Sequence, residues 1–365
     1  MLVRLSIPPH PDGRDQQLLR TLGNIPEPVY GLQLQDFAVP NVMPEGGVQV
    51  TYREFPVALA DGLQVQLRQP TVAIIDTSYG PLHPQAQFSA RVAPPMIGLG
   101  LLAALDAADI IAREDPADAD GDGISGRANR VWDQSGGLTV LGRFGWKAGQ
   151  PSLPQQNAAA FASDMGITSQ LLPGDTCPAS VNCQTFSGGA PELEPRIQEQ
   201  VDFYTANLAV PMRRNVDDPQ VQLGWKVFLD SGCAACHTPT WTTGRSSHEW
   251  LSHQTIHPFT DLLLHDMGPG LADGHVVLVA GQRHAVGDAE AQPPAARVER
   301  EEAVDRRAAA WVGAVEDFDV RPAPDAGCGD EAAERPSGQH LLWRADAVCR
   351  HPCRQRQFQP AGRRH

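Results

Sequence analysis

The chain has 365 residues, of which 41% are hydrophobic, and a formal net charge of −14 at pH 7. This length is enough for two or three domains with a sizeable core. The negative charge argues against a nucleic-acid partner, because phosphate binding requires clustered lysine and arginine. An acidic surface instead suits a basic partner, such as a small redox protein. No apolar run approaches the length of about 20 residues that a membrane span requires.

The first part of the chain predicts an irregular segment followed by a hairpin. Residues 1–46 are rich in proline and glycine and show little periodicity. Within residues 47–80, hydrophobic and polar residues alternate on both sides of Asp61-Gly62, which is a typical turn pair. We therefore expect a β-hairpin element there.

Helical periodicity dominates the next part of the chain. Residues 81–215 are predicted to form a mainly helical core region. Apolar residues recur on one face over 97–114 and again over 197–208, which predicts a helix in each range. A third helix is expected to begin after Asp218, with Pro219 at its first position, because aspartate caps and proline starts helices well.

That third helix leads directly into Cys233-Ala-Ala-Cys236-His237. Covalent attachment of haem c needs two thiols for the vinyl groups and an imidazole beside them for the iron. We predict that Cys233 and Cys236 form the thioethers and that His237 is the proximal iron ligand. The alternatives are half of a zinc site, which needs a second ligand pair, and a thioredoxin-like dithiol, which follows a strand rather than a helix.

The sixth iron ligand is left open between two residues, His265 and Met267. Both lie downstream of the motif at a plausible separation, and a structural turn with a buried histidine is the alternative. Methionine ligation would raise the reduction potential and favour electron transfer, whereas an open position would favour peroxide chemistry.

A second metal site is predicted upstream, in an acidic loop. Asp118, Asp120 and Asp122 alternate with other residues, and the carbonyl of Ile124 follows. Hard oxygen ligands at this spacing suit Ca²⁺. The twelfth position is Asn129 rather than a bidentate glutamate, and the alternative is a solvated acidic turn.

Two further cysteines bear on the cellular compartment. Cys177 and Cys183 lie close together in a loop and are expected to form a disulfide, with two free thiols as the alternative. A disulfide and haem c both indicate the periplasm. The first residues do not resemble a signal peptide, so we expect that the chain lacks its true N-terminus.

Several stretches together resemble the bacterial di-haem oxidoreductases. These peroxidase-like proteins, formerly called thiol oxidoreductases, are related to di-haem cytochrome c peroxidases. The resemblance covers about residues 1–275 and is carried by the segments 29–36, 91–100, 120–127, 141–148, 164–168, 232–237 and 261–268.

The resemblance implies two haems, one meeting hydrogen peroxide and the other passing electrons. The haem at Cys233 would correspond to the C-terminal, electron-transferring haem. The donor would be a small redox protein or a quinol-linked protein. Trp132 and Trp146 could relay electrons between haems, as a tryptophan does in related peroxidases, or they could be core aromatics.

The chain departs from the family pattern at both ends. The family motif for an upstream haem is missing, and the family segments expected after Gly268 do not appear. We hypothesise a frameshift near residue 280, because residues 284–292 read one nucleotide later permit a family-like segment. Residues 281–365 are accordingly expected to be an atypical tail with little stable structure.

The sequence therefore predicts a mainly α fold with cytochrome c-like domains, a small β-hairpin insertion and irregular loops. Residues 216–280 would be a partial cytochrome c domain. The expected function is a peroxidase-like c-type haem oxidoreductase. The alternatives are a mono-haem periplasmic electron carrier without catalysis and a non-functional fragment.

Overall fold

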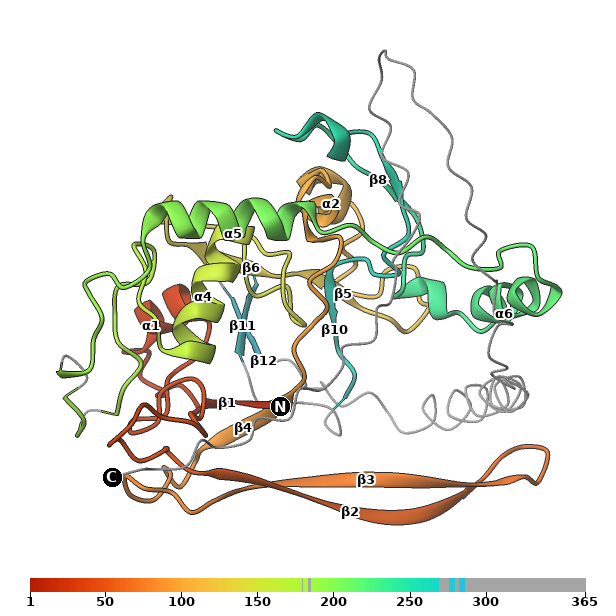
Figure 1. Ribbon diagram of the computed structural model, residues 1–365. Coiled ribbons are helices and arrows are strands. Elements are labelled where there is room, and N and C mark those ends of the chain that lie inside the picture. Colours follow the sequence, from red (N-terminus) through yellow and green to blue (C-terminus); the bar gives the residue numbers. More distant parts are fainter. Residues whose placement is uncertain (179, 183–184, 269–275, 280–281, 286–365) are drawn as a thin grey trace, which may run out of the picture. The chain divides into compact units, whose positions relative to one another are not determined.

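The computed structural model of the protein describes residues 1–178, 180–182, 185–268, 276–279 and 282–285. These residues belong to one compact unit, Met1–Asp317. Within this described part, the chain forms six α-helices and six antiparallel sheets of two strands each (Figure 1).

The expected mainly α, cytochrome c-like fold is wrong. Helix and strand each account for 23% of the described chain. The longest of the described helices, α4 (Leu153–Met165) and α5 (Pro195–Asn207), have 13 residues each. The physical reason lies in the composition: the sequence holds 32 prolines and 34 glycines. Proline removes a helix donor and glycine lowers helix propensity, so apolar runs are divided into short elements.

The helix predicted over residues 97–114 is in fact two short helices, α2 (Leu99–Ala103) and α3 (Ala107–Ile111). Between them, Arg143 donates to the carbonyl oxygens of Leu102 at 3.2 Å and Leu105 at 2.6 Å. Carbonyls at a helix end need partners, and this arginine supplies them from a distant segment. The apolar periodicity runs across the break and therefore does not reveal it.

The helix predicted over 197–208 is present as α5, which packs against α4 and α2. Asn157 of α4 donates to the Asp202 carboxylate at 2.7 Å and to the Thr205 hydroxyl at 2.9 Å. A Cβ on Gly100 of α2 would lie 1.9 Å from the carbonyl oxygen of Ala206. Only glycine therefore permits this close crossing of α2 over α5. A further short helix, α1 (Gln16–Leu22), precedes these elements.

The predicted hairpin is present as β2 (Gly47–Ala58) and β3 (Gln64–Ile75), the long orange ribbon in Figure 1. Gly62 adopts a φ of 85°, and the Asp61 carboxylate accepts the Leu63 N–H at 3.0 Å. Val48 and Ile74 at its base pack against a core of Val3, Leu5, Tyr30 and Leu34.

Short strand pairs join distant parts of the chain. β1 (Leu2–Ser6) pairs with β4 (Gln87–Arg91), and β5 (Gly126–Ala128) with β10 (Leu263–His265). The remaining pairs are β6 (Arg130–Asp133) with β7 (Leu138–Leu141), β8 (Trp241–Thr242) with β9 (Thr255–Ile256), and β11 (Val276–Val279) with β12 (Gln282–Ala285).

A second core joins α2 and α3 to β8 and β9. Its buried members come from both sides of the haem motif in sequence: Leu105, Ile110, Trp241, Ile256 and Leu262. This core gives the segment that follows the motif a fixed support.

Three expectations concern features at the margin of the described residues. Cys177 forms a disulfide, while Cys183, its predicted partner, lies outside the described residues. Apart from β12, the predicted tail 281–365 and the frameshift hypothesis also fall outside them. Among the described helices, none has the length and apolar character needed to cross a membrane.

Candidate functional site

The helix α6 (Pro219–Asp230) brings the chain to the predicted haem motif. Its start is the predicted one, with Pro219 at the first position and the Asp218 carboxylate accepting the Gln220 N–H at 2.8 Å. Gly232, with a φ of 76°, then turns the chain into a short 3₁₀ helix, η2 (Cys233–Ala235).

The two cysteines of the motif are free thiols on this turn. Cys233 is exposed and Cys236 is half-buried. Burial raises the pKa of the Cys236 thiol, and the nearby carboxylates of Asp261 and Asp122 raise it further. Cys236 therefore stays protonated at neutral pH. A protonated thiol is the group that adds to a haem vinyl to give a thioether.

One ring nitrogen of His237 has a hydrogen-bond partner, and the other has none among the described residues. Its Nδ1 lies 3.0 Å from the carbonyl oxygen of Phe259. A carbonyl oxygen only accepts hydrogen bonds, so Nδ1 must carry the proton. The neutral ring then leaves the Nε2 lone pair available to a metal, which is the arrangement that a ligating histidine requires. The motif thus fits an axial haem ligand in its donor chemistry.

Aromatic rings form an apolar wall beside this hydrogen bond. The ring of Phe259 meets Trp225 and Phe228 of α6 edge to face, with centroid distances of 6.2 and 5.5 Å. Trp225 and Phe228 stack on each other, with ring centroids 5.7 Å apart.

The space around Gly224 of α6 is open, because a Cβ on this residue would meet no atom within 4 Å. Within the described residues, no helix therefore crosses α6 closely at this glycine.

The segment that provides the carbonyl is conformationally strained. Phe259 and Leu262 have positive φ angles of 53° and 62°, which side-chain-bearing residues rarely adopt. Side-chain bonds hold the segment: the Thr260 hydroxyl accepts the Leu262 N–H at 3.1 Å, and Asp261 accepts the Leu263 N–H at 2.9 Å. Strain of this kind persists where surrounding contacts over-determine the backbone.

His265, one candidate for the sixth ligand, uses both ring nitrogens within the protein. Nε2 lies 2.8 Å from the Asp261 carboxylate, and Nδ1 lies 3.0 Å from the carbonyl oxygen of Ser125. The Asp261 hydrogen bond raises the pKa of His265, against the opposing effect of burial. Ligation by His265 would therefore require one of these bonds to break. Met267, the other candidate, is 65% exposed.

The acidic loop lies directly before the Ser125 carbonyl. One carboxylate oxygen from each of Asp118, Asp120 and Asp122 lies within 4.8 Å of the others. Asp122 also accepts the Ile124 N–H at 2.8 Å. Three negative charges this close repel one another unless a cation or protons compensate them. The charge of Asp122 raises the pKa of the Cys236 thiol, so the acidic loop is close enough to act electrostatically on the motif.

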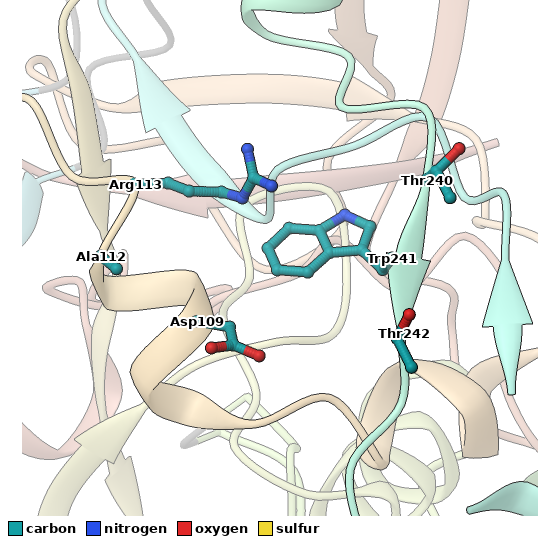
Figure 2. Close-up of a pocket in the computed structure, with 6 residues that line it drawn as sticks. All are labelled: Asp109, Ala112, Arg113, Thr240, Trp241 and Thr242. Atoms are coloured by element: carbon teal, nitrogen blue, oxygen red, sulfur yellow. The ribbon is translucent and has the colours of Figure 1, made fainter. Parts of the chain in front are cut away.

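A pocket of about 370 Å³ lies between residues of and after α3 and residues of and before β8 (Figure 2). Figure 2 shows the guanidinium of Arg113 beside the indole of Trp241, and the two are 4.4 Å apart, measured from Cζ to the ring centroid. The other lining residues are Asp109, Ala112, Thr240 and Thr242. Trp132 and Trp146 are not among the residues that line it.

A protein-family model matches most of the chain. The family described as "Di-haem oxidoreductase, putative peroxidase" matches residues 32–286, well over half of the chain. The chain belongs to this di-haem oxidoreductase family. Comparison with curated proteins and with solved structures gave no match.

The family match covers every predicted site residue of this di-haem oxidoreductase, from Asp118 to Met267. The sequence nevertheless contains a single Cys-x-x-Cys-His motif. The predicted tryptophans differ in environment: Trp146 is 63% exposed, and Trp132 is half-buried beneath the guanidinium of Arg20, 5.0 Å from its ring centroid. The core interpretation therefore does not suit Trp146.

Sequence reasoning missed four residues of the candidate site: Arg113, Trp241, Phe259 and Asp261. Phe259 acts through its backbone carbonyl, which leaves no signal in residue type. Asp261 and Arg113 act through partners that folding brings close. Trp241 offered one weak signal, as a tryptophan only four residues after His237.

Proposed function

We propose that this di-haem oxidoreductase binds one haem c at Cys233 and Cys236, that His237 ligates the iron, and that this haem transfers electrons in a peroxidase-like enzyme. The observation that carries the proposal is the hydrogen bond from His237 Nδ1 to the Phe259 carbonyl. It holds the imidazole in one tautomer and one orientation, with Nε2 free. When bound, haem supplies a one-electron redox centre.

The protein's own residues would each contribute a defined part. The two thiols would anchor the haem covalently. The Phe259 carbonyl accepts a hydrogen bond from the Nδ1–H of His237, which makes the imidazole a stronger electron donor at Nε2. The rings of Trp225, Phe228 and Phe259 exclude water from one side. In this proposal hydrogen peroxide is the oxidising substrate, and Cys233, Cys236 and His237 would hold a haem that supplies electrons for its reduction.

A mono-haem electron carrier without catalysis is the second candidate. The observation that favours it is the single Cys-x-x-Cys-His motif in a family of di-haem proteins. The two candidates differ in peroxide turnover. Peroxide-dependent oxidation of a donor supports the enzyme, with the haem at His237 either six-coordinate or open. A haem-loaded protein without turnover supports the carrier.

The first experiment is haem content after export in a host that matures c-type cytochromes. Mass spectrometry and the pyridine haemochrome spectrum should show one covalent haem per chain. Cys233→Ala with Cys236→Ala should abolish it, whereas Cys177→Ser, a cysteine outside the motif, should retain it. A stable wild-type chain without haem would reject the proposal and leave the third alternative, a non-functional fragment.

For the sixth ligand we propose Met267, because both nitrogens of His265 are already bonded. Met267→Ala should remove the charge-transfer band of methionine-ligated ferric haem, and His265→Ala should leave it. The reverse result would assign His265. An unchanged, high-spin spectrum in both variants would indicate an open position.

We further propose that Asp118, Asp120 and Asp122, with the Ile124 carbonyl, bind Ca²⁺. The convergence of three carboxylate oxygens supports this assignment. Calorimetric titration of the chelator-treated protein should show one site that Asp120→Asn weakens. Asp12→Asn, an exposed acid outside the loop, serves as the control. Equal Ca²⁺ binding by both variants would favour the solvated turn.

We propose a periplasmic location and an electron donor that is a small redox protein or a quinol-linked protein. The disulfide at Cys177 supports an oxidising compartment. The net charge of −14 favours a basic donor, because opposite charges steer encounter. Fractionation of the native host would test the location.

A further inference from the structure

Two side chains make hydrogen bonds to the residues that follow His237 and Phe259. The Trp241 indole Nε1–H donates to the backbone carbonyl oxygen of Thr260 at 2.9 Å, and Thr260 directly follows Phe259. Arg113 Nη1 donates to the side-chain hydroxyl of Thr238 at 3.4 Å, and Thr238 directly follows His237. Each partner of the central hydrogen bond therefore has a neighbouring residue that is held by one of these side chains.

The two holding side chains also contact each other. Arg113 Cζ lies 4.4 Å from the centroid of the Trp241 ring, within the range of a cation–π contact (Figure 2). Contacts thus run in a closed circuit from His237 through Phe259 and Thr260 to Trp241, on to Arg113, and back through Thr238. We name these six residues the clamp.

The clamp packs against the second core through Trp241. Trp241 is only 5% exposed and packs with Leu105, Ile110 and Leu262. Arg113 lies two residues after the end of α3, which contributes Ile110 to the same core. The clamp therefore connects the motif to a packed support rather than to a mobile loop.

We propose that Trp241 and Arg113 are positioning residues that fix the strength of the His237–Phe259 hydrogen bond and thereby the reduction potential of the haem. This rests on the proposed function, since it assumes that His237 ligates iron. A carbonyl held in place accepts a stronger hydrogen bond from Nδ1, which makes the imidazole more electron-rich and stabilises ferric iron. A tight clamp therefore lowers the potential.

The haem-loaded test uses Trp241→Phe, which removes the indole donor but keeps an aromatic ring in the core. Spectroelectrochemical titration should show a higher reduction potential than in the wild type. Trp250→Phe is the matched control, because that indole donates to Asn207 at 2.7 Å, outside the clamp. Equal potentials for Trp241→Phe and the wild type would overturn the proposal.

A second test needs no haem and so separates this inference from the proposed function. In the haem-free full chain, hydrogen exchange of the Trp241 indole proton is followed by NMR. Thr238→Val removes the Arg113 acceptor with little change of shape, and His237→Phe removes the donor to Phe259. Each should speed exchange by about fivefold or more, as expected for losing a connected hydrogen bond.

The Trp250 indole proton reports in the same spectra and should exchange at its wild-type rate. Unchanged exchange at Trp241 in both variants would show that the contacts are independent, which overturns the clamp whether or not haem binds. Conversely, suppose that the wild-type chain binds no haem while Thr238→Val and His237→Phe speed the exchange at Trp241. That result would support the clamp and contradict the proposed function.

Discussion

Two buried glutamates near the first core satisfy their carboxylates differently. Glu27 accepts the backbone N–H groups of Val29, Tyr30 and His83 at 2.7 to 2.8 Å. Glu45 accepts only the Gln35 N–H, at 2.8 Å, and its second oxygen has no partner among the described residues. Burial raises the pKa of Glu45 to about 7, and the charge of Glu27 adds to this effect.

The raised pKa predicts a pH-dependent stability. The folded state holds the Glu45 proton more tightly than the unfolded state. The contribution of Glu45 to the free energy of unfolding is therefore fully present below about pH 4.5 and is lost as the pH rises through about 7. Glu45→Gln should remove this slope. At pH 8 the variant should exceed the wild type by up to about 3 kcal/mol, from 1.36 kcal/mol per pKa unit. Urea unfolding at pH 5 and pH 8 measures it.

Glu27→Gln is the matched control and should have the opposite result. Its side chain would present an NH₂ group to backbone donors, so stability should fall by about 1–3 kcal/mol at both pH values. A Glu45→Gln variant that keeps the wild-type pH slope would assign the slope to another group.

At the scale of elements, sequence reasoning succeeded where the signal was local. Asp218-Pro219 marks the start of α6, and Asp61-Gly62 marks the β2–β3 turn, because each pair determines its own backbone. The break between α2 and α3 depends instead on Arg143, about 40 residues away. No window of sequence contains both the helix end and the group that caps it, so periodicity alone predicted one continuous helix.

This capping role predicts a cost for removing the guanidinium. Arg143→Met removes the guanidinium donor from the Leu102 and Leu105 carbonyls, so the free energy of unfolding should fall by about 2 kcal/mol. Arg53→Met, which removes an exposed guanidinium bonded to Gln69, should change it by less than about 0.5 kcal/mol. Denaturant unfolding compares the two. Equal effects would remove Arg143 from its role as a cap.

The hairpin should show a gradient of stability along its length. Val48 and Ile74 anchor its base to the first core, whereas most side chains farther along are exposed. A two-stranded ribbon without such packing is only marginally stable in water. Amide exchange should therefore be slow near Val48 and Ile74 and fast toward Gly62. Uniform protection along both strands would indicate an additional contact.

At the scale of the molecule, the net charge of −14 predicts the salt dependence of electron exchange. A cationic inorganic reductant should reduce the haem-loaded protein faster at low than at high ionic strength. An anionic reductant should show the opposite dependence, with the slower rate at low ionic strength. Stopped-flow rates at two salt concentrations measure both. Rates that do not respond to salt for either reagent would show that local rather than global charge controls the approach.

The site was predictable only in part for a related reason. Cys233, Cys236 and His237 form a contiguous motif, so residue type and spacing are enough to predict them as haem ligands. The carbonyl of Phe259, the indole of Trp241 and the guanidinium of Arg113 enter the site through folding. Their roles depend on distances that no spacing rule specifies, which is why the sequence predicts the ligands but not the groups that orient them.

The strand pair β5–β10 has a consequence for the order in which the protein matures. The His237–Phe259 contact spans 22 residues, whereas the contact of His265 with Ser125 spans 140. Short loops close faster than long ones. As the exported chain folds, the loop that presents the thiols and imidazole can therefore form before the long-range pair closes. The attachment machinery would then meet its substrate loop while the rest of the chain is still open.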